Sequence, residues 1–191
     1  MKRQTLHRRL ALAVLALALA GCAGVPVTTM ARLATKGPDY LLDAQPLELR
    51  VALDVDERIK AAATQSPVLV VVLRSADRDA PPVLERNIPL AVDTAPSARQ
   101  GLPAAGAHRG WLVWRVDPAG ARQFAEVQQR LRDMRAAKEK GSLGLGVKLD
   151  GLAQAFPQFM STEVATWMLI RPEDGYYKMW SGRIADAAGK G

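Results

Sequence analysis

Few side chains in this sequence have the chemistry of a nucleophile, a general base or a metal ligand. Cys22 is the only cysteine, and His108 is the only histidine that follows it. A lone thiol excludes a disulfide within the chain, and a zinc site needs several His, Cys or carboxylate ligands. A Ser-His-Asp triad would depend on His108, and no serine stands in a nucleophile-elbow motif. We therefore predict a protein that is not an enzyme, with no catalytic residue, no metal and no cofactor.

Two other patterns resemble sites only superficially. The carboxylates Asp54 with Asp56, and Asp77 with Asp79, are paired in sequence, but a calcium site needs six or more oxygens from a defined loop. The glycine-rich segment GSLGLGVK (141–148) has the wrong spacing for either common phosphate-binding motif. A glycosidase would need two converging carboxylates, and the spacing selects no particular pair.

The residues around Cys22 give a more specific signal. An apolar run at 10–19 is shorter than the roughly 20 residues that a membrane-spanning helix needs. Four basic residues precede it, with no acid among them: Lys2, Arg3, Arg8 and Arg9. The motif Leu19-Ala20-Gly21-Cys22 resembles the lipobox of bacterial lipoproteins. That resemblance implies a signal peptide over 1–21, a diacylglycerol on the thiol of Cys22, and an acylated amine on the same residue.

The resemblance also implies where the protein is held. One acyl chain anchors a protein only marginally, whereas several chains give stable attachment to a membrane. In this class of protein an Asp after the cysteine often marks retention in the inner membrane, and here Ala23 takes that place. We expect an anchor in the outer membrane with the domain on the periplasmic face, and the inner membrane is the less favoured alternative.

Composition limits the remaining classes. Without the four basic residues of the predicted signal, 22 basic residues stand against 19 acidic ones, so the processed chain is only slightly basic. This balance does not indicate a nucleic-acid binder. The length after Cys22 suits one domain. We divide the chain into a lipidated tether (22–45), a single β-rich domain (46–186) and a short tail (187–191). The sequence sets no oligomeric state.

Hydrophobic periodicity predicts seven strands. They cover 47–55, 68–74, 83–92, 111–116, 143–149, 162–171 and 176–184. The first alternates apolar and polar residues, which is typical of a half-buried strand, whereas the second is apolar on both faces and predicts a central strand. Pro89 within the third indicates a sheet edge or a bulge.

One long amphipathic helix is predicted over 118–140. Asp117 is placed to cap it, Pro118 suits its first turn, and Gly141 is expected to end it. Its apolar face recurs at helical spacing through Phe124, Val127, Leu131 and Met134. The fold class is therefore mainly β: an antiparallel β-sandwich or a curved sheet of about seven strands, with the helix inserted between strands four and five. Gly144 and Gly146 would leave room for the helix to lie close to the fifth strand.

The last two strands carry an aromatic strip. If Pro172 and Gly175 close this hairpin, Trp167 lies opposite Trp180, whereas a two-residue Asp174-Gly175 turn would place Trp167 against Gly182. One face would then present a candidate partner-binding strip: Trp167, Trp180, Tyr176, Arg171 and Lys178. The alternative, which we favour, is that the helix covers the tryptophans.

These features favour a non-catalytic, lipid-anchored accessory or assembly factor that binds a protein partner in the cell envelope. The alternatives are a small envelope hydrolase or glycan-binding protein, and a lipid carrier, which would need a large cavity lined by Leu and Val. The segment SPVLVVVLRSADRDAP (66–81) resembles the first strand region of type VI secretion outer-membrane lipoproteins. That resemblance implies a partner-binding sandwich, and the long helix after the fourth strand departs from it.

Overall fold

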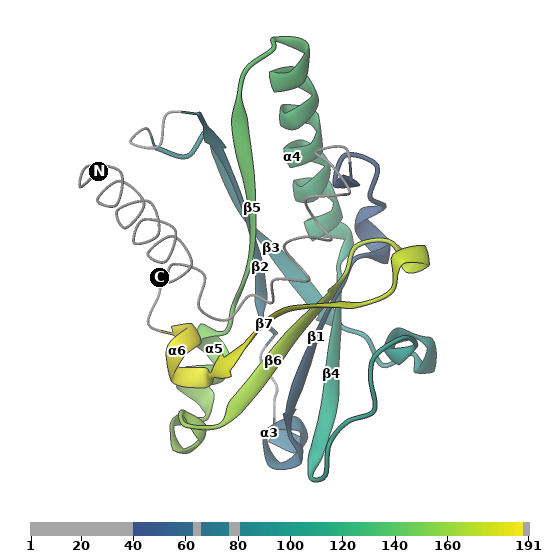
Figure 1. The fold of residues 1–191 in the computed structure, drawn as a ribbon, viewed down its shortest axis with the longest axis vertical. Coiled ribbons are helices and arrows are strands. Elements are labelled where there is room, and N and C mark those ends of the chain that lie inside the picture. The colour runs from purple at the N-terminus through teal and green to yellow at the C-terminus, as the bar shows by residue number, and fades with distance from the viewer. Residues whose placement is uncertain (1–39, 63–65, 77–80, 189–191) are drawn as a thin grey trace, which may run out of the picture.

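The computed structural model describes residues 40–62, 66–76 and 81–188. They form one seven-stranded antiparallel sheet in the order β5-β2-β3-β4-β1-β6-β7, which curls into a half-barrel with β5 and β7 at its edges (Figure 1). The strands are β1 (Arg50–Asp56), β2 (Val68–Ser75), β3 (Leu84–Val92), β4 (Arg109–Val116), β5 (Gly141–Lys148), β6 (Glu163–Leu169) and β7 (Tyr177–Arg183). Of the two arrangements expected, the curved sheet is the one that forms, and the long helix stands between strands four and five as predicted.

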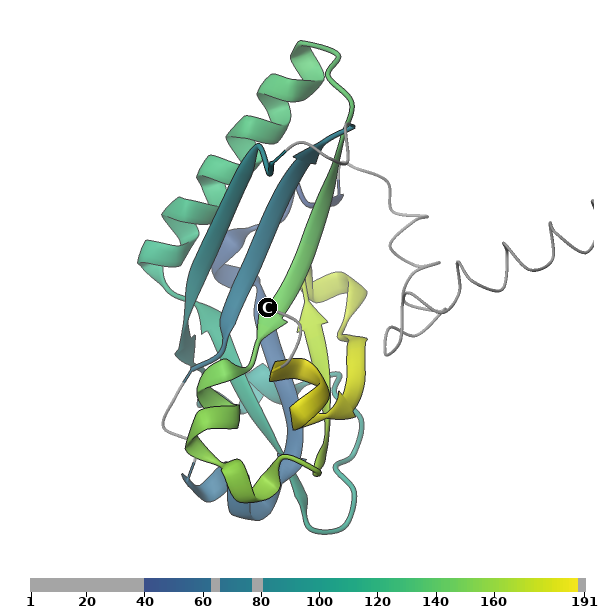
Figure 2. The same ribbon diagram turned by 90° about the vertical axis from the view of Figure 1, so that its left-hand side faces the viewer.

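One long helix lies along a face of this sheet, and three short helices lie beyond the ends of strands (Figure 1). They are α3 (Glu57–Ala62), α4 (Pro118–Ala136), α5 (Asp150–Ala155) and α6 (Ile184–Ala188), with short 3₁₀ turns η2 (Pro46–Glu48), η3 (Pro96–Arg99), η4 (Pro157–Phe159) and η5 (Pro172–Asp174). Helix α4 packs mainly on β3, along one face of the β5-β2-β3 half of the sheet, while α5 and α6 pack together at the other end (Figure 2).

Helix α4 begins as its sequence predicts. The side chain of Asp117 accepts a hydrogen bond from the backbone N–H of Gly120 at 2.6 Å, and Pro118 occupies the first position. Phe124, Val127 and Met134 are buried on the face turned to the sheet. Capping and periodicity therefore act together to place this helix.

The end of α4 differs from the prediction. The helix ends at Ala136, and Gly141 is the first residue of β5. Lys138 adopts a left-handed φ of 54°, its N–H bonds to the carbonyl of Arg135, and the next N–H bonds to that of Met134. This pattern is a Schellman motif, which normally uses glycine. A lysine in the glycine position explains why the sequence signal was misplaced.

Strand β1 starts later than its alternation suggests. Pro46 opens the turn η2, Leu47 is 52% exposed, and the strand proper runs from Arg50. Proline suits the first position of a helical turn because its φ is fixed and it needs no N–H partner there. The strand is also more than half-buried, since Ala52 on its second face is fully buried.

The expectation that Pro89 marks a sheet edge is wrong. Strand β3 lies inside the sheet, between β2 and β4. It pairs with β2 up to Pro89, opposite Val68, and with β4 from Leu90 onward. The proline thus marks the point where the strand exchanges one neighbour for the other.

Gly144 and Gly146 of β5 face away from the helix. A Cβ atom built at Gly146 would meet no atom within 4 Å, and one at Gly144 would come no nearer than 3.7 Å to the carbonyl of Val72. The intervening Leu143 and Leu145 are half-buried against the main core instead. The predicted close approach of helix to glycine is therefore wrong, because the helix lies on the leucine side.

Two apolar clusters fill the two faces of the sheet. The main core includes Val51, Leu53, Val71 and Phe124 and lies on the α4 side. The second cluster consists of Ala52, Ala98, Trp111, Val113, Leu169 and Tyr176, with Leu102 and Trp167 packed against it. The loop that carries η3 therefore covers part of the outer face.

Candidate functional site

The predicted aromatic strip is divided by the register of the last hairpin. Trp167 pairs with Lys178 and Thr166 pairs with Trp180, with a bulge between Thr166 and Trp167. Neither predicted register forms, because a bulge adds one unpaired residue to β7 and moves the side chains that follow to the opposite face. The turn is a 3₁₀ turn closed by Gly175, whose φ is 68°.

Trp167 belongs to the second cluster. Its ring meets Trp111 edge to face, with centroids 6.0 Å apart and planes at 88°, and the ammonium of Lys178 lies 5.7 Å from its centroid. Tyr176 donates its hydroxyl to the carbonyl of Ala98 at 2.7 Å. Burial raises the pKa of Tyr176 to about 12, since an ionised phenolate there would lose its hydration. The η3 loop covers Trp167 and Tyr176 on this face. The expectation that the helix covers both tryptophans is therefore wrong.

Trp180 lies on the other face. It is half-buried and packs against the main core. A Cβ atom at Gly182 would fall 2.5 Å from its Cζ2 atom, so the indole lies directly over that glycine. Trp167 and Trp180 therefore do not form one continuous surface, and a partner-binding role for the hairpin stays a prediction.

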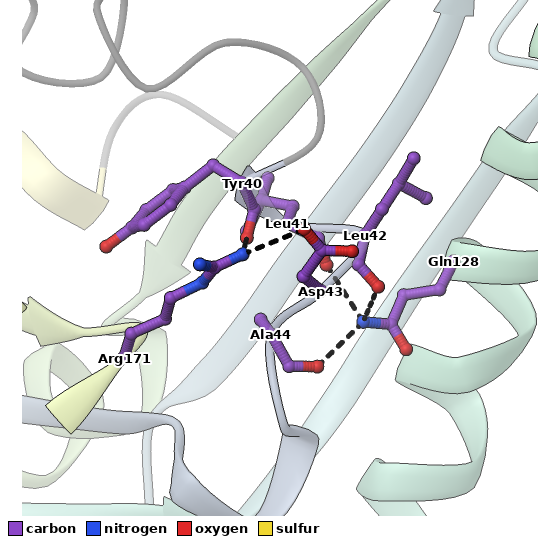
Figure 3. Close-up of polar contacts among 7 residues, drawn as sticks. All are labelled: Tyr40, Leu41, Leu42, Asp43, Ala44, Gln128 and Arg171. Atoms are coloured by element: carbon purple, nitrogen blue, oxygen red, sulfur yellow. Dashed lines mark hydrogen bonds and ion pairs between the residues drawn. The ribbon is translucent and has the colours of Figure 1, made fainter. Parts of the chain in front are cut away.

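Arg171, the fourth residue of the predicted strip, instead holds the segment 40–44, which we call the strap. Its Nη2 atom donates to the carbonyl of Tyr40 and to the carboxylate of Asp43, each at 3.2 Å (Figure 3). Its guanidinium carbon also lies 5.0 Å from the centroid of the Tyr40 ring. Three types of contact thus fix one end of the strap to the turn that follows β6.

Gln128 of α4 holds the other side of the strap. Its Nε2 atom donates to the carbonyls of Leu41 at 2.8 Å, Leu42 at 3.2 Å and Ala44 at 2.9 Å (Figure 3). The residue is only 6% exposed, although it is polar and stands on the buried side of the helix. Buried polar groups are energetically costly without hydrogen-bond partners. These bonds therefore give the Gln128 amide nitrogen its partners and fix the strap across the half-barrel.

A pocket of about 810 Å³ opens beside the strap. Its walls come from the strap, β2, α4, the turn after α4, β5 and β7: Tyr40, Leu41, Leu42, Leu73, Leu131, Met134, Arg135, Glu139, Lys140, Gly141, Ser142, Leu143, Leu145 and Met179. The pocket thus extends from β5, one edge strand of the half-barrel, to Met179 on β7, the other edge strand. Its volume is within the range of about 300–1,000 Å³ that is common for small-ligand sites.

The charged residues of this pocket gather at one end. Arg135, Glu139 and Lys140 belong to the end of α4 and the turn that follows, directly before β5. Leu145 lies four residues along β5 from Gly141, which corresponds to about 13 Å of strand. The pocket is therefore amphipathic, with charge at the α4–β5 turn and Leu and Met side chains beyond it.

The carboxylates Asp54 and Asp56 form ion pairs with neighbouring arginines. Asp54 accepts from Nε of Arg109 at 2.8 Å, and Asp56 accepts from the backbone N–H and guanidinium of Arg58, whose hydrogen bonds hold the pKa of Asp56 well below its usual range. His108 is exposed in a turn with a φ of 59°. Among the described residues, no group of three or more His, Cys, Asp or Glu is placed to hold a metal ion.

Several predictions fall outside the described residues. They include Cys22, the whole predicted signal and lipobox, Asp77 and Asp79. Within the part of the chain that the structure describes, no helix has the length and apolar character needed to cross a membrane. The lipid anchor therefore rests on the sequence.

The strap and the pocket were the features that the sequence showed least. Tyr40, Leu41 and Leu42 are an apolar group in the predicted tether, and Leu131 and Met134 follow the helical period, but nothing in the sequence joins these segments. A scan of family models, a search of curated proteins and a search of solved structures each found no match to the chain. The pocket is consequently interpreted from its own geometry and chemistry.

Proposed function

We propose that this protein is a non-catalytic, lipid-anchored envelope protein that holds one acyl chain of a lipid in the pocket beside the strap. The anchor is Cys22, and the domain faces the periplasm from the outer membrane. The proposal develops the lipid-carrier alternative of the sequence analysis. The protein-partner hypothesis has less support, because the two tryptophans of its candidate binding strip lie on different faces of the sheet.

The observation that carries the proposal is the lining of the pocket. Beyond its charged end, the walls consist mainly of Leu, Met and Tyr side chains from five parts of the fold. Burial of an acyl chain is worth about 0.8 kcal/mol per CH₂ group, and an open, apolar pocket provides that burial without specific polar contacts. The flexible thioethers of Met134 and Met179 suit an occupant of variable shape.

The expected position of the anchor agrees with such a ligand. Eighteen residue steps separate Cys22 from Tyr40, so the strap lies within about 65 Å of the anchor even if the chain is fully extended. A lipidated Cys22 would therefore keep the pocket near a bilayer surface, where acyl chains are the most abundant apolar ligands.

Two adjacent substitutions on β5 test this proposal. Leu145→Glu places a carboxylate in the pocket, whereas Gly146→Glu places the same charge on the open face of the same strand. Residues 23–191 contain every described element and avoid the need for detergent. Titration with a neutral, fluorescently labelled monoacylglycerol should show binding by the parent chain, about tenfold weaker binding by Leu145→Glu, and unchanged binding by Gly146→Glu, because a buried charge opposes apolar contact.

Thermal melting of both variants provides the control for folding. The acyl-chain proposal fails if the parent chain does not bind the monoacylglycerol, or if both folded variants weaken binding equally.

A further inference from the structure

Strand β5 is an open edge of the half-barrel. Among the described residues it pairs only with β2, along its full length from Gly141 to Lys148, and no second strand lies on its other side (Figure 1). An edge strand presents a row of unpaired backbone N–H and C=O groups, and natural proteins usually protect such an edge with charges, prolines or bulges. Between Gly141 and Val147, β5 has none of these protections.

The opposite edge strand, β7, is protected. Its pairing with β6 contains a bulge, and it carries the charged residues Lys178 and Arg183. Helix α6 follows it directly. The contrast between the two edges points to a partner strand for β5.

One hydrogen bond shows which backbone groups of β5 face outward. The N–H of Ala76 donates to the carbonyl of Lys140 at 3.0 Å, and these two residues continue the register of β2 and β5. In an antiparallel ladder, successive residues alternate between bonding to the neighbouring strand and facing away from it. The residues of β5 that bond to β2 are therefore the even-numbered ones. The backbone groups that face the open edge belong to Gly141, Leu143, Leu145 and Val147.

We propose that β5 pairs with β5 of a second copy of this chain, antiparallel and about a two-fold axis at Leu145. In this register Leu145 lies opposite Leu145 of the second copy, and Leu143 lies opposite Val147. Each of these pairs would exchange two backbone hydrogen bonds, so the outward groups of all three residues gain partners. On the other face of the sheet, Gly144 would lie opposite Gly146, where no side chain obstructs the pairing.

Charge selects this register over its neighbours. A two-fold axis at Gly144 would set Lys148 against Lys140 of the second copy, and like charges directly opposite each other are destabilising. An axis at Leu143 would set Val147 against Glu139. With the axis at Leu145, Lys148 lies opposite Ser142, and apolar residues meet only apolar ones. This self-complementarity identifies a second copy of the chain as the partner.

The pairing would also extend one wall of the pocket. Leu143 and Leu145 line the pocket, and both are only half-buried. Directly opposite residues of an antiparallel pair lie on the same face of the sheet. The leucines of the second copy would therefore continue the apolar wall beyond the edge of β5. The dimer does not depend on which ligand the pocket holds, so either proposal can fail without the other.

Sedimentation of the chain 23–191 from micromolar to submillimolar concentration tests the dimer. We expect reversible association of two copies. Amide exchange gives a second measurement, because the N–H groups of Leu143 and Leu145 face outward, whereas those of Gly144 and Gly146 bond to β2. The leucine amides should exchange slowly at high concentration and fast on dilution, and the glycine amides should remain protected throughout.

Two double variants test the register. Gly144→Lys with Gly146→Lys would set lysines against lysines of the second copy and should weaken association by about tenfold or more. Gly144→Lys with Gly146→Glu would set opposite charges in the same positions and should retain association. Neither glycine has a positive φ, and a Cβ atom at either position meets nothing closer than 3.7 Å. Both variants are therefore expected to fold, which thermal melting checks.

Gln129→Lys with Gln158→Lys controls for overall charge. It adds the same two charges at exposed positions away from β5 and should leave association unchanged. Equal weakening in this control would overturn the proposal, because the effect would then come from net charge.

The remaining outcomes are equally decisive. A parent chain that stays monomeric overturns the proposal, and slow exchange of the leucine amides in that monomer would assign the edge to another segment of the same chain. A dimer that the two lysines do not weaken would have its interface elsewhere. Equal weakening by the lysine–lysine and lysine–glutamate variants would overturn the register at Leu145.

Discussion

Two polar side chains position the strap, and both differ from what their sequence context suggests. Gln128 stands on the buried face of an amphipathic helix and donates to three strap carbonyls. Arg171 belongs to the predicted partner-binding strip, yet it binds Tyr40 and Asp43. Both side chains form bonds to segments more than 80 residues away, so their roles depend on contacts that no local pattern specifies.

Replacement of Gln128 tests the strap at the residue scale. Gln128→Met keeps the size of the side chain and removes the donor, which leaves up to three carbonyls without this partner. We expect the free energy of unfolding to fall by about 2 kcal/mol, since each buried polar group left unsatisfied costs about 1–3 kcal/mol. Urea denaturation measures the change, and amide exchange at 40–44 should become faster.

Gln129→Met serves as the matched control. Gln129 is exposed on the same helix, where its amide donates to Asp133 and accepts from Arg132. Its replacement should change stability by less than about 0.5 kcal/mol. Similar values for both variants would show that the contacts of Gln128 with the strap contribute nothing measurable.

At the scale of elements, α4 packs most extensively on β3, and its first turn comes close to that strand. A Cβ atom at Gly120 would lie 2.7 Å from the carbonyl oxygen of Pro89 and 2.8 Å from Cγ2 of Ile88. The glycine therefore permits close approach of the first helical turn to the strand.

Gly120→Ala measures the importance of this approach. Alanine is the better helix former by about 1 kcal/mol, so an isolated helix would gain stability. In the folded protein we expect a net loss of about 1–3 kcal/mol, because backbone and core must move to admit the methyl group. Calorimetry would detect this as a lower melting temperature.

Gly146→Ala provides the comparison, because a Cβ atom there meets open space. It should leave the melting temperature nearly unchanged or raise it slightly. A stabilised Gly120→Ala variant would contradict the close packing of α4 on β3.

At the scale of the whole molecule, the half-barrel has a main core on one face and a smaller cluster on the other. The helices and strap cover the inner face only in part, and the pocket lies where that cover is incomplete. Within the described residues, the wall of the pocket thus combines segments from the first and last parts of the domain.

The predicted anchor is tested on the intact protein in cells. Cys22→Ser removes the only thiol and should move the protein from the membrane fraction to the soluble fraction, because the acyl chains supply the binding free energy. Labelled palmitate should enter the parent protein and not the variant. Retention of an unlabelled variant in the membrane, with no palmitate in the parent, would rule out lipidation at this residue.

The sequence by itself determined the seven strands and the start of the long helix, because each depends on neighbouring residues: period-two alternation for the strands and an Asp-Pro cap for the helix. The anchor at Cys22 also follows from a local motif, and it stays a prediction. It misplaced the end of α4, where a lysine takes the left-handed position that usually marks a glycine. Only the tertiary structure decided which face each tryptophan joins, since a single bulge between Thr166 and Trp167 changes the face of every later side chain on β7. The pocket depended on the curl of the sheet and on two polar contacts to the strap. Those contacts join residues far apart in sequence, and their pairing is fixed only once the whole sheet has formed.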